Sequence, residues 1–80
     1  MVGPMFLMEI MELRETIDET STDDELKLLL NDNDSKIKAL STELSESFQS
    51  GDLDTALKLT AMMQYWTRVD ETIREKMGAQ

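Results

Sequence analysis

Acidic side chains and methionines are the residues in this sequence whose type and spacing could support chemistry. Glu9, Glu12 and Glu15 follow one another at helical spacing, as do the carboxylates of di-iron helical bundles. Such a centre also needs Glu-x-x-His pairs, and the sequence contains no histidine. Carboxylates that act as acid and base need a pocket that raises one pKa, and a small helical domain offers little room for one. We therefore expect that the chain is not an enzyme.

Two other patterns imitate metal sites. The run from Asp32 to Glu43 resembles a calcium loop, but Lys36 and Ile37 stand where that loop needs an oxygen ligand and a glycine. Methionines spaced three apart over residues 5–11 would suit copper(I), although helical methionines far more often pack or contact a partner. Without cysteine, zinc knuckles and iron–sulfur ligation are excluded as well. We expect no cofactor and no metal site.

The charge balance limits the class of partner. Seventeen acidic residues against eight Lys and Arg give a net charge of −9. Nucleic acids and anionic membranes both require clustered basic side chains, so neither is an expected partner. No apolar run approaches the roughly 18 residues that span a bilayer. Residues 1–8 also lack the basic segment of a signal peptide.

Three helical segments must position any functional residues. An apolar stripe at Phe6, Ile10, Leu13 and Ile17 predicts the first helix, with a proline near its start. A capping-box pattern, Ser/Thr-x-x-Glu, opens a second helix at Thr22, which we place at about residues 22–49. Ser50-Gly51-Asp52 is the clearest break, and a third helix follows it to about residue 77.

The polar run Asn31–Asp34 allows two interpretations: a weak point within one long helix, or a turn between two short helices. Positions 26, 30, 33, 37, 40, 44 and 48 stay on one helix face, with only Asn33 polar. A turn would usually move the later apolar residues off this face, so one continuous helix is favoured.

The predicted fold is therefore all-α, an antiparallel three-helix bundle with a short first helix. Residues 1–4 are interpreted as an N-terminal tail or expression remnant, and residues 5–78 as one domain. The residues expected to be largely buried are Phe6, Ile10, Leu13, Ile17, Leu30, Ile37, Leu40, Leu44, Phe48, Leu57, Met63, Trp66 and Ile73.

The first helix has more apolar residues than one stripe can bury. Leu7 and Met11 lie about 100–140° from the stripe, and Met8 lies further round. Glutamates at positions 12, 15 and 19 share this outer face. An apolar patch rimmed by carboxylates is typical of a protein-binding surface. A broad buried face, or methionines that are simply exposed, would produce the same pattern.

The adjacent rings of Tyr65 and Trp66 point about 100° apart on the third helix, so both cannot enter the core. Trp66 follows the predicted buried face, which leaves Tyr65 at its edge. A half-buried ring with its hydroxyl in water is the simplest interpretation of Tyr65.

The segment Phe6–Glu15, with the sequence FLMEIMELRE, resembles the opening of the C-terminal domain of HscB-type J-protein co-chaperones. Those proteins serve iron–sulfur cluster assembly. A second stretch is similar to the same family: Phe48, then Gly51–Ala56, then Met62–Trp66. The resemblance covers about residues 5–77, and it departs from the family at Asn31–Asp34.

This resemblance implies a domain that binds the IscU-type scaffold protein and presents it to a DnaK-type ATPase chaperone. It also implies a location in the bacterial cytoplasm or the mitochondrial matrix. The competing hypothesis is a generic helical module in which the surplus apolar face mediates weak self-association. The scaffold-binding residues that the resemblance implies are Leu7, Met8, Met11, Glu12, Glu15, Glu19 and Tyr65.

The family's J-domain carries a His-Pro-Asp triplet that stimulates the chaperone, and this sequence has no histidine. The chain is thus expected to be a C-terminal fragment, with DnaK-type chaperones engaged only through the missing J-domain. A Cys-x-x-Cys metal module found in some eukaryotic members is also absent from the sequence.

Overall fold

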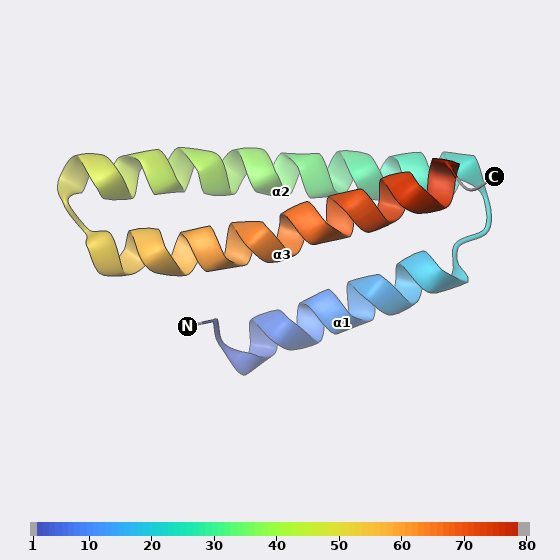
Figure 1. Ribbon diagram of the computed structural model, residues 1–80, viewed down its shortest axis with the longest axis horizontal. Coiled ribbons are helices and arrows are strands. Elements are labelled where there is room, and N and C mark those ends of the chain that lie inside the picture. Colours follow the sequence, from blue (N-terminus) through green and yellow to red (C-terminus); the bar gives the residue numbers. More distant parts are fainter. Residues whose placement is uncertain (1, 79–80) are drawn as a thin grey trace.

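The computed structural model describes residues 2–78, which form α1 (Pro4–Glu19), α2 (Asp23–Ser50) and α3 (Leu53–Gly78). Figure 1 shows α2 and α3 side by side in opposite directions, with α1 running along the C-terminal part of α3. The predicted all-α three-helix bundle is confirmed. Met1, part of the predicted tail, lies outside the described residues. Within residues 2–78, no helix is both long enough and apolar enough to cross a membrane.

Local signals in the sequence set the ends of the helices. Pro4 lies in the first turn of α1, where its missing N–H leaves no partner unsatisfied. The Thr22 hydroxyl accepts a hydrogen bond from the Glu25 backbone N–H at 3.3 Å, as the capping pattern predicts. At the other end of α2, Gly51 has φ 77°, a left-handed conformation that glycine adopts without strain.

The turn into α3 depends on Asp52. Its carboxylate accepts a hydrogen bond from the Thr55 backbone N–H at 3.2 Å. Hydrogen bonds from the side chain and backbone of Thr55 lower the pKa of the Asp52 carboxyl below its ordinary value. The chain therefore reverses direction within Gly51 and Asp52, which places α2 and α3 in contact from one end to the other.

Helix α2 continues unbroken through Asn31–Asp34, which confirms the single-helix interpretation. Asn33 is buried against α3, and its Nδ2 donates a hydrogen bond to the Trp66 carbonyl oxygen at 2.9 Å. Asparagine is a poor helix former, but this contact between α2 and α3 satisfies its side-chain donor. Tertiary packing outweighs local propensity here.

The core lies between α2 and α3 and is closed by one face of α1. Five of the residues predicted to be buried are buried: Ile10, Ile17, Leu40, Trp66 and Ile73. Six others pack half-buried against them: Phe6, Leu13, Leu30, Ile37, Leu44 and Met63. The core also contains four residues that are absent from the list of residues expected to be buried: Leu26, Ala56, Leu59 and Val69.

The predictions for Phe48 and Leu57 are wrong, because both side chains are exposed. Buried residues of α2 include Leu40 and Ser47, one heptad apart, so the repeat selects Ser47 rather than its larger neighbour Phe48. On α3, Leu57 precedes Trp66 by about two and a half helical turns and so points the opposite way.

Leu59 and Leu57 form a matched pair for testing which face of α3 is buried. Replacing buried Leu59 with alanine should lower the free energy of unfolding by about 2–3 kcal/mol through lost burial and a cavity. Leu57→Ala should change it by no more than about 0.5 kcal/mol, because Leu57 is already exposed. Urea denaturation followed by circular dichroism measures both. Equal losses of unfolding free energy in the two variants would contradict the observed burial of Leu59 and exposure of Leu57.

Two lysines attach α1 to the α2–α3 hairpin. The Lys36 ammonium lies 3.2 Å from a Glu9 carboxylate oxygen and 4.2 Å from the centre of the Trp66 ring. Lys76 donates hydrogen bonds to the carbonyl oxygens of Ile17 and Asp18 at the end of α1. These links add to the packing of Ile10 and Ile17, whose buried side chains attach α1 to the hairpin.

Candidate functional site

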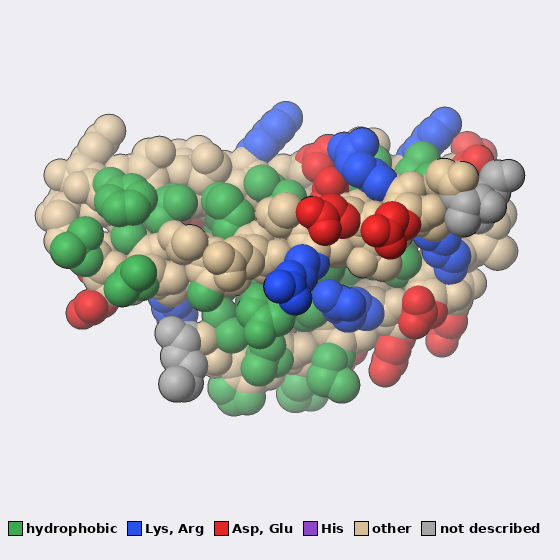
Figure 2. Space-filling view, in the orientation of Figure 1, with side chains coloured by type: hydrophobic (Ala, Val, Ile, Leu, Met, Phe, Trp, Pro, Cys, Tyr) green, Lys and Arg blue, Asp and Glu red, His purple; other side chains and the backbone are tan. Residues whose placement is uncertain are grey.

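The outer surface of α1 carries exposed apolar side chains. Relative exposures are 36% for Leu7, 59% for Met8 and 62% for Met11, while the neighbouring Ile10 is buried. Figure 2 shows hydrophobic side chains gathered along the outer edge of the molecule where α1 lies. Met8 and Met11 therefore lie mostly outside the intramolecular core, whereas Leu7 presents only part of its side chain to solvent.

The ion pair between Glu9 and Lys36 shows which side of α1 faces α2. Leu7 and Met11 project about 160–200° from Glu9 around the helix, so they lie on the flank of α1 that faces away from α2. On α3, Tyr65 packs at the edge of the core. Helical geometry thus places Leu7 and Met11 on one flank of α1, while Tyr65 approaches α1 from α3.

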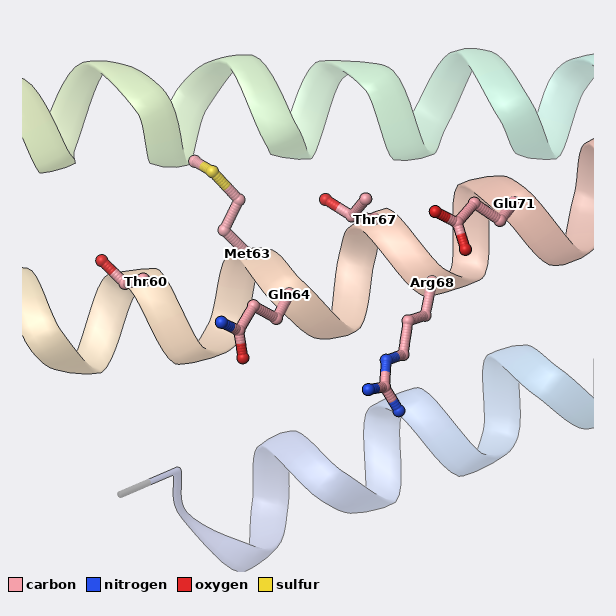
Figure 3. A pocket seen from close by; sticks show the side chains of 6 residues that line it. All are labelled: Thr60, Met63, Gln64, Thr67, Arg68 and Glu71. Carbon is pink, nitrogen blue, oxygen red and sulfur yellow. The ribbon is translucent and has the colours of Figure 1, made fainter.

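Tyr65 is half-buried at this junction. Its ring meets the Phe6 ring edge-on, with centroids 5.7 Å apart, and the Phe6 ring makes the same contact with Trp66. Tyr65 also lines a small surface hollow with Gln64 and Arg68. Figure 3 shows the Arg68 side chain extending from α3 towards α1.

The other flank of α1 holds the remaining apolar member of the predicted site. Met8 and Glu12 line a shallow groove with Met5 and Met62, and Phe6 and Glu9 complete it. The sequence analysis did not select Met5 or Met62 for the site. Their position could have been found only from the packing of α1 on α3, because neither belongs to the surplus stripe.

Glu15 and Glu19 extend the acidic rim of Glu12 towards the C-terminal end of α1, and all three side chains are exposed. Six of the seven predicted residues lie on α1, and α3 contributes Tyr65. Carboxylates on such a rim attract basic partners over long distances more than they hold them.

A second groove lies on α3, lined by Thr60, Met63, Gln64, Thr67, Arg68 and Glu71. Figure 3 shows these side chains projecting in different directions, with Arg68 and Glu71 apart from one another. Among residues 2–78, no cluster of three or more Asp, Glu, His or Cys is arranged to hold a metal ion.

Known proteins resemble this chain over most of its length. The family model described as "HSCB C-terminal oligomerisation domain" matches residues 2–74. The chain is 38% identical over 74 residues to an "Iron-sulfur cluster co-chaperone protein HscB homolog" of Arabidopsis thaliana, a match that covers 92% of this chain and 29% of the relative. It is 28% identical over 71 residues to the human "Iron-sulfur cluster co-chaperone protein HscB", covering 89% of this chain and 30% of that protein.

No solved structure matches the chain significantly. The chain spans about 30% of the length of the two curated relatives. Both relatives are named as co-chaperones, and neither name denotes an enzyme. The chain belongs to the HscB family of iron–sulfur cluster co-chaperones and matches the C-terminal domain of that family.

Proposed function

We propose that this chain binds the IscU-type iron–sulfur scaffold protein and, as part of a longer co-chaperone, presents it to a DnaK-type ATPase chaperone. The observation that carries the proposal is the exposure of Leu7, Met8 and Met11 on α1. Large apolar side chains left outside the core of a small bundle are typical of a protein-binding surface. The names of the relatives support a role in iron–sulfur cluster assembly, and the scaffold is the partner that we infer from that role.

The proposed interface has an apolar centre and a charged rim. Leu7, Met11 and Tyr65 supply the desolvated anchors, which carry most of the binding free energy in protein interfaces. Glu12, Glu15 and Glu19 steer and orient a partner with a basic surface, so their contribution falls as salt screens it.

Calorimetric titration of this chain with an IscU-type scaffold tests the proposal directly. We expect saturable one-to-one binding that weakens severalfold between low and physiological ionic strength, because the acidic rim is screened. A Glu12→Gln, Glu15→Gln, Glu19→Gln variant should lose most of this salt dependence and retain most of the affinity at high salt. A scaffold that gives no saturable signal with the unmodified chain would overturn the proposal.

The same proposal predicts that this chain does not stimulate a DnaK-type ATPase. The expected result is a hydrolysis rate within experimental error of the chaperone alone, because the chain has no histidine and hence no His-Pro-Asp triplet. A steady-state phosphate-release assay without scaffold measures this rate, and a J-domain protein serves as the positive control. Stimulation by the isolated chain would contradict the prediction.

Self-association is a second candidate function, and it is favoured by one finding. The matching family model describes an oligomerisation domain. Scaffold binding and self-association do not exclude each other if they use different surfaces.

A further inference from the structure

The end of the α2–α3 hairpin carries a second exposed apolar surface, which we call the tip patch: Phe48, Leu53 and Leu57. Their relative exposures are 59%, 62% and 70%. Figure 2 shows hydrophobic side chains gathered at the end where α2 turns into α3. The inner positions beside them hold the small residues Ser47 and Ala56, so the core closes there without the larger side chains.

The tip patch is separate from the proposed scaffold site. Helix α1 has 16 residues, whereas α2 has 28 and α3 has 26, so α1 covers only part of the hairpin. Figure 1 shows that α1 lies along the C-terminal part of α3 and leaves the hairpin turn uncovered. Within residues 2–78, no other helix reaches the tip patch.

The shape of the tip patch suits a second copy of the same surface. Phe48, Leu53 and Leu57 border an almost wholly apolar hollow of about 170 Å³, whose other lining residues are Ala56 and Thr60. One surface thus offers both protruding apolar side chains and a hollow to receive them. Twofold association requires such self-complementarity, because each copy presents the same patch to the other.

Charges beside the patch are compatible with the same arrangement. Asp54 and Lys58 lie one helical turn apart on α3 and flank Leu57. The presence of both signs lets two antiparallel copies pair an acidic group with a basic one. The net charge of −9 on each copy opposes association at long range, so any dimer must strengthen when salt screens that repulsion.

We propose that the tip patch is the surface through which two copies of this chain self-associate. This inference rests on the second candidate function, self-association, and is independent of scaffold binding. It assigns the oligomerisation named in the family description to Phe48, Leu53 and Leu57 rather than to the exposed face of α1.

Sedimentation equilibrium of the full chain over a wide concentration range, at low and high salt, tests the assignment. We expect a monomer–dimer equilibrium that tightens as salt increases, opposite to the salt dependence expected for scaffold binding. Leu57→Glu should weaken dimerisation at least tenfold, since it places a charge in the apolar interface. Leu53→Lys tests the patch with the opposite charge.

Leu28→Glu is the matched control, because Leu28 is 66% exposed on α2 and lies outside the patch. It should leave the dimerisation constant unchanged, and circular dichroism should show every variant to be folded. Leu57→Glu should also bind the scaffold as the unmodified chain does.

Several outcomes would overturn the inference. One is a chain that stays monomeric at every concentration and salt. Others are Leu57→Glu and Leu53→Lys variants that dimerise normally, or a Leu28→Glu control that weakens dimerisation as strongly. Loss of the dimer in a Leu7→Ala, Met11→Ala variant would place self-association on α1 instead. If the chain dimerises normally but does not bind the scaffold, scaffold binding is refuted and the assignment of the tip patch is not.

Discussion

Replacing Trp66 with alanine is expected to unfold most of this protein at physiological temperature. The Trp66 ring is buried between α1 and α2, meets the Phe6 ring edge-on and lies under the Lys36 ammonium. Removing a buried aromatic side chain costs about 3–5 kcal/mol. Natural domains have only about 5–15 kcal/mol of stability, and a chain this short belongs at the low end.

Thermal and urea denaturation followed by circular dichroism measure the Trp66→Ala effect. A loss of 3 kcal/mol or more corresponds to a fall in Tm of at least about 12 °C for a domain of this size. Thr67→Ala is the control, because the neighbouring Thr67 side chain is exposed. A loss below about 1 kcal/mol for Trp66→Ala would show that α1 does not pack on the hairpin as described.

The second large effect is expected on scaffold binding. Alanine at Leu7, Met11 and Tyr65 together should weaken binding by several kcal/mol, which is on the order of 10²-fold or more in Kd. The reason is that these side chains form the apolar anchors of the proposed interface. Calorimetric titration of the folded triple variant against the scaffold measures the loss.

Tyr65 also packs on Phe6, so the triple variant will lose some stability. The double variant Leu7→Ala, Met11→Ala avoids this problem because it leaves the Tyr65 contact in place. It should weaken binding at least tenfold with little change in Tm. Leu28→Ala removes a leucine of α2 that is 66% exposed, more than Leu7, and this variant should bind normally. A double variant with unchanged affinity would refute the proposed site.

The sequence was sufficient to predict the helices because the signals for their ends are local. Thr22 caps α2 through one hydrogen bond, and Gly51 adopts a left-handed conformation at its end. The continuity of α2 through Asn33 could be predicted from the helical spacing of the apolar residues on either side of it. The hydrogen bond from Asn33 to the Trp66 carbonyl could not, because it joins residues on two different helices.

The ends of the buried faces were harder to predict, because hydropathy and helical geometry disagree there. Phe48 is more apolar than Ser47, yet Ser47 continues the buried repeat of α2. On α3, Leu57 and Leu59 are equally apolar, and only their phase relative to Trp66 distinguishes them. Residue type therefore identified a buried position correctly only where the apolar residue also lay on the helix face that packs against the other helices.

For the candidate site, the sequence predicts which residues of α1 cannot enter the core, since helical periodicity determines that. It does not predict how α1 is rotated and placed against α3. That placement depends on contacts between helices, such as the Glu9–Lys36 ion pair and the contact of Phe6 with Tyr65. Met62 was therefore missed, because its position beside residues of α1 arises only in the folded chain.

The lysine link at the end of α1 has a consequence for the order in which the binding surface forms. Helix α1 has no basic residue in its last turn, so Lys76, in the last turn of α3, supplies the positive charge and the hydrogen bonds there. A ribosome makes α1 first and Lys76 more than fifty residues later. During synthesis, the helix that carries Leu7 and Met11 therefore lacks its C-terminal partner until almost all of α3 has been added. A nascent chain cut short within α3 would expose the same apolar residues on an unanchored segment.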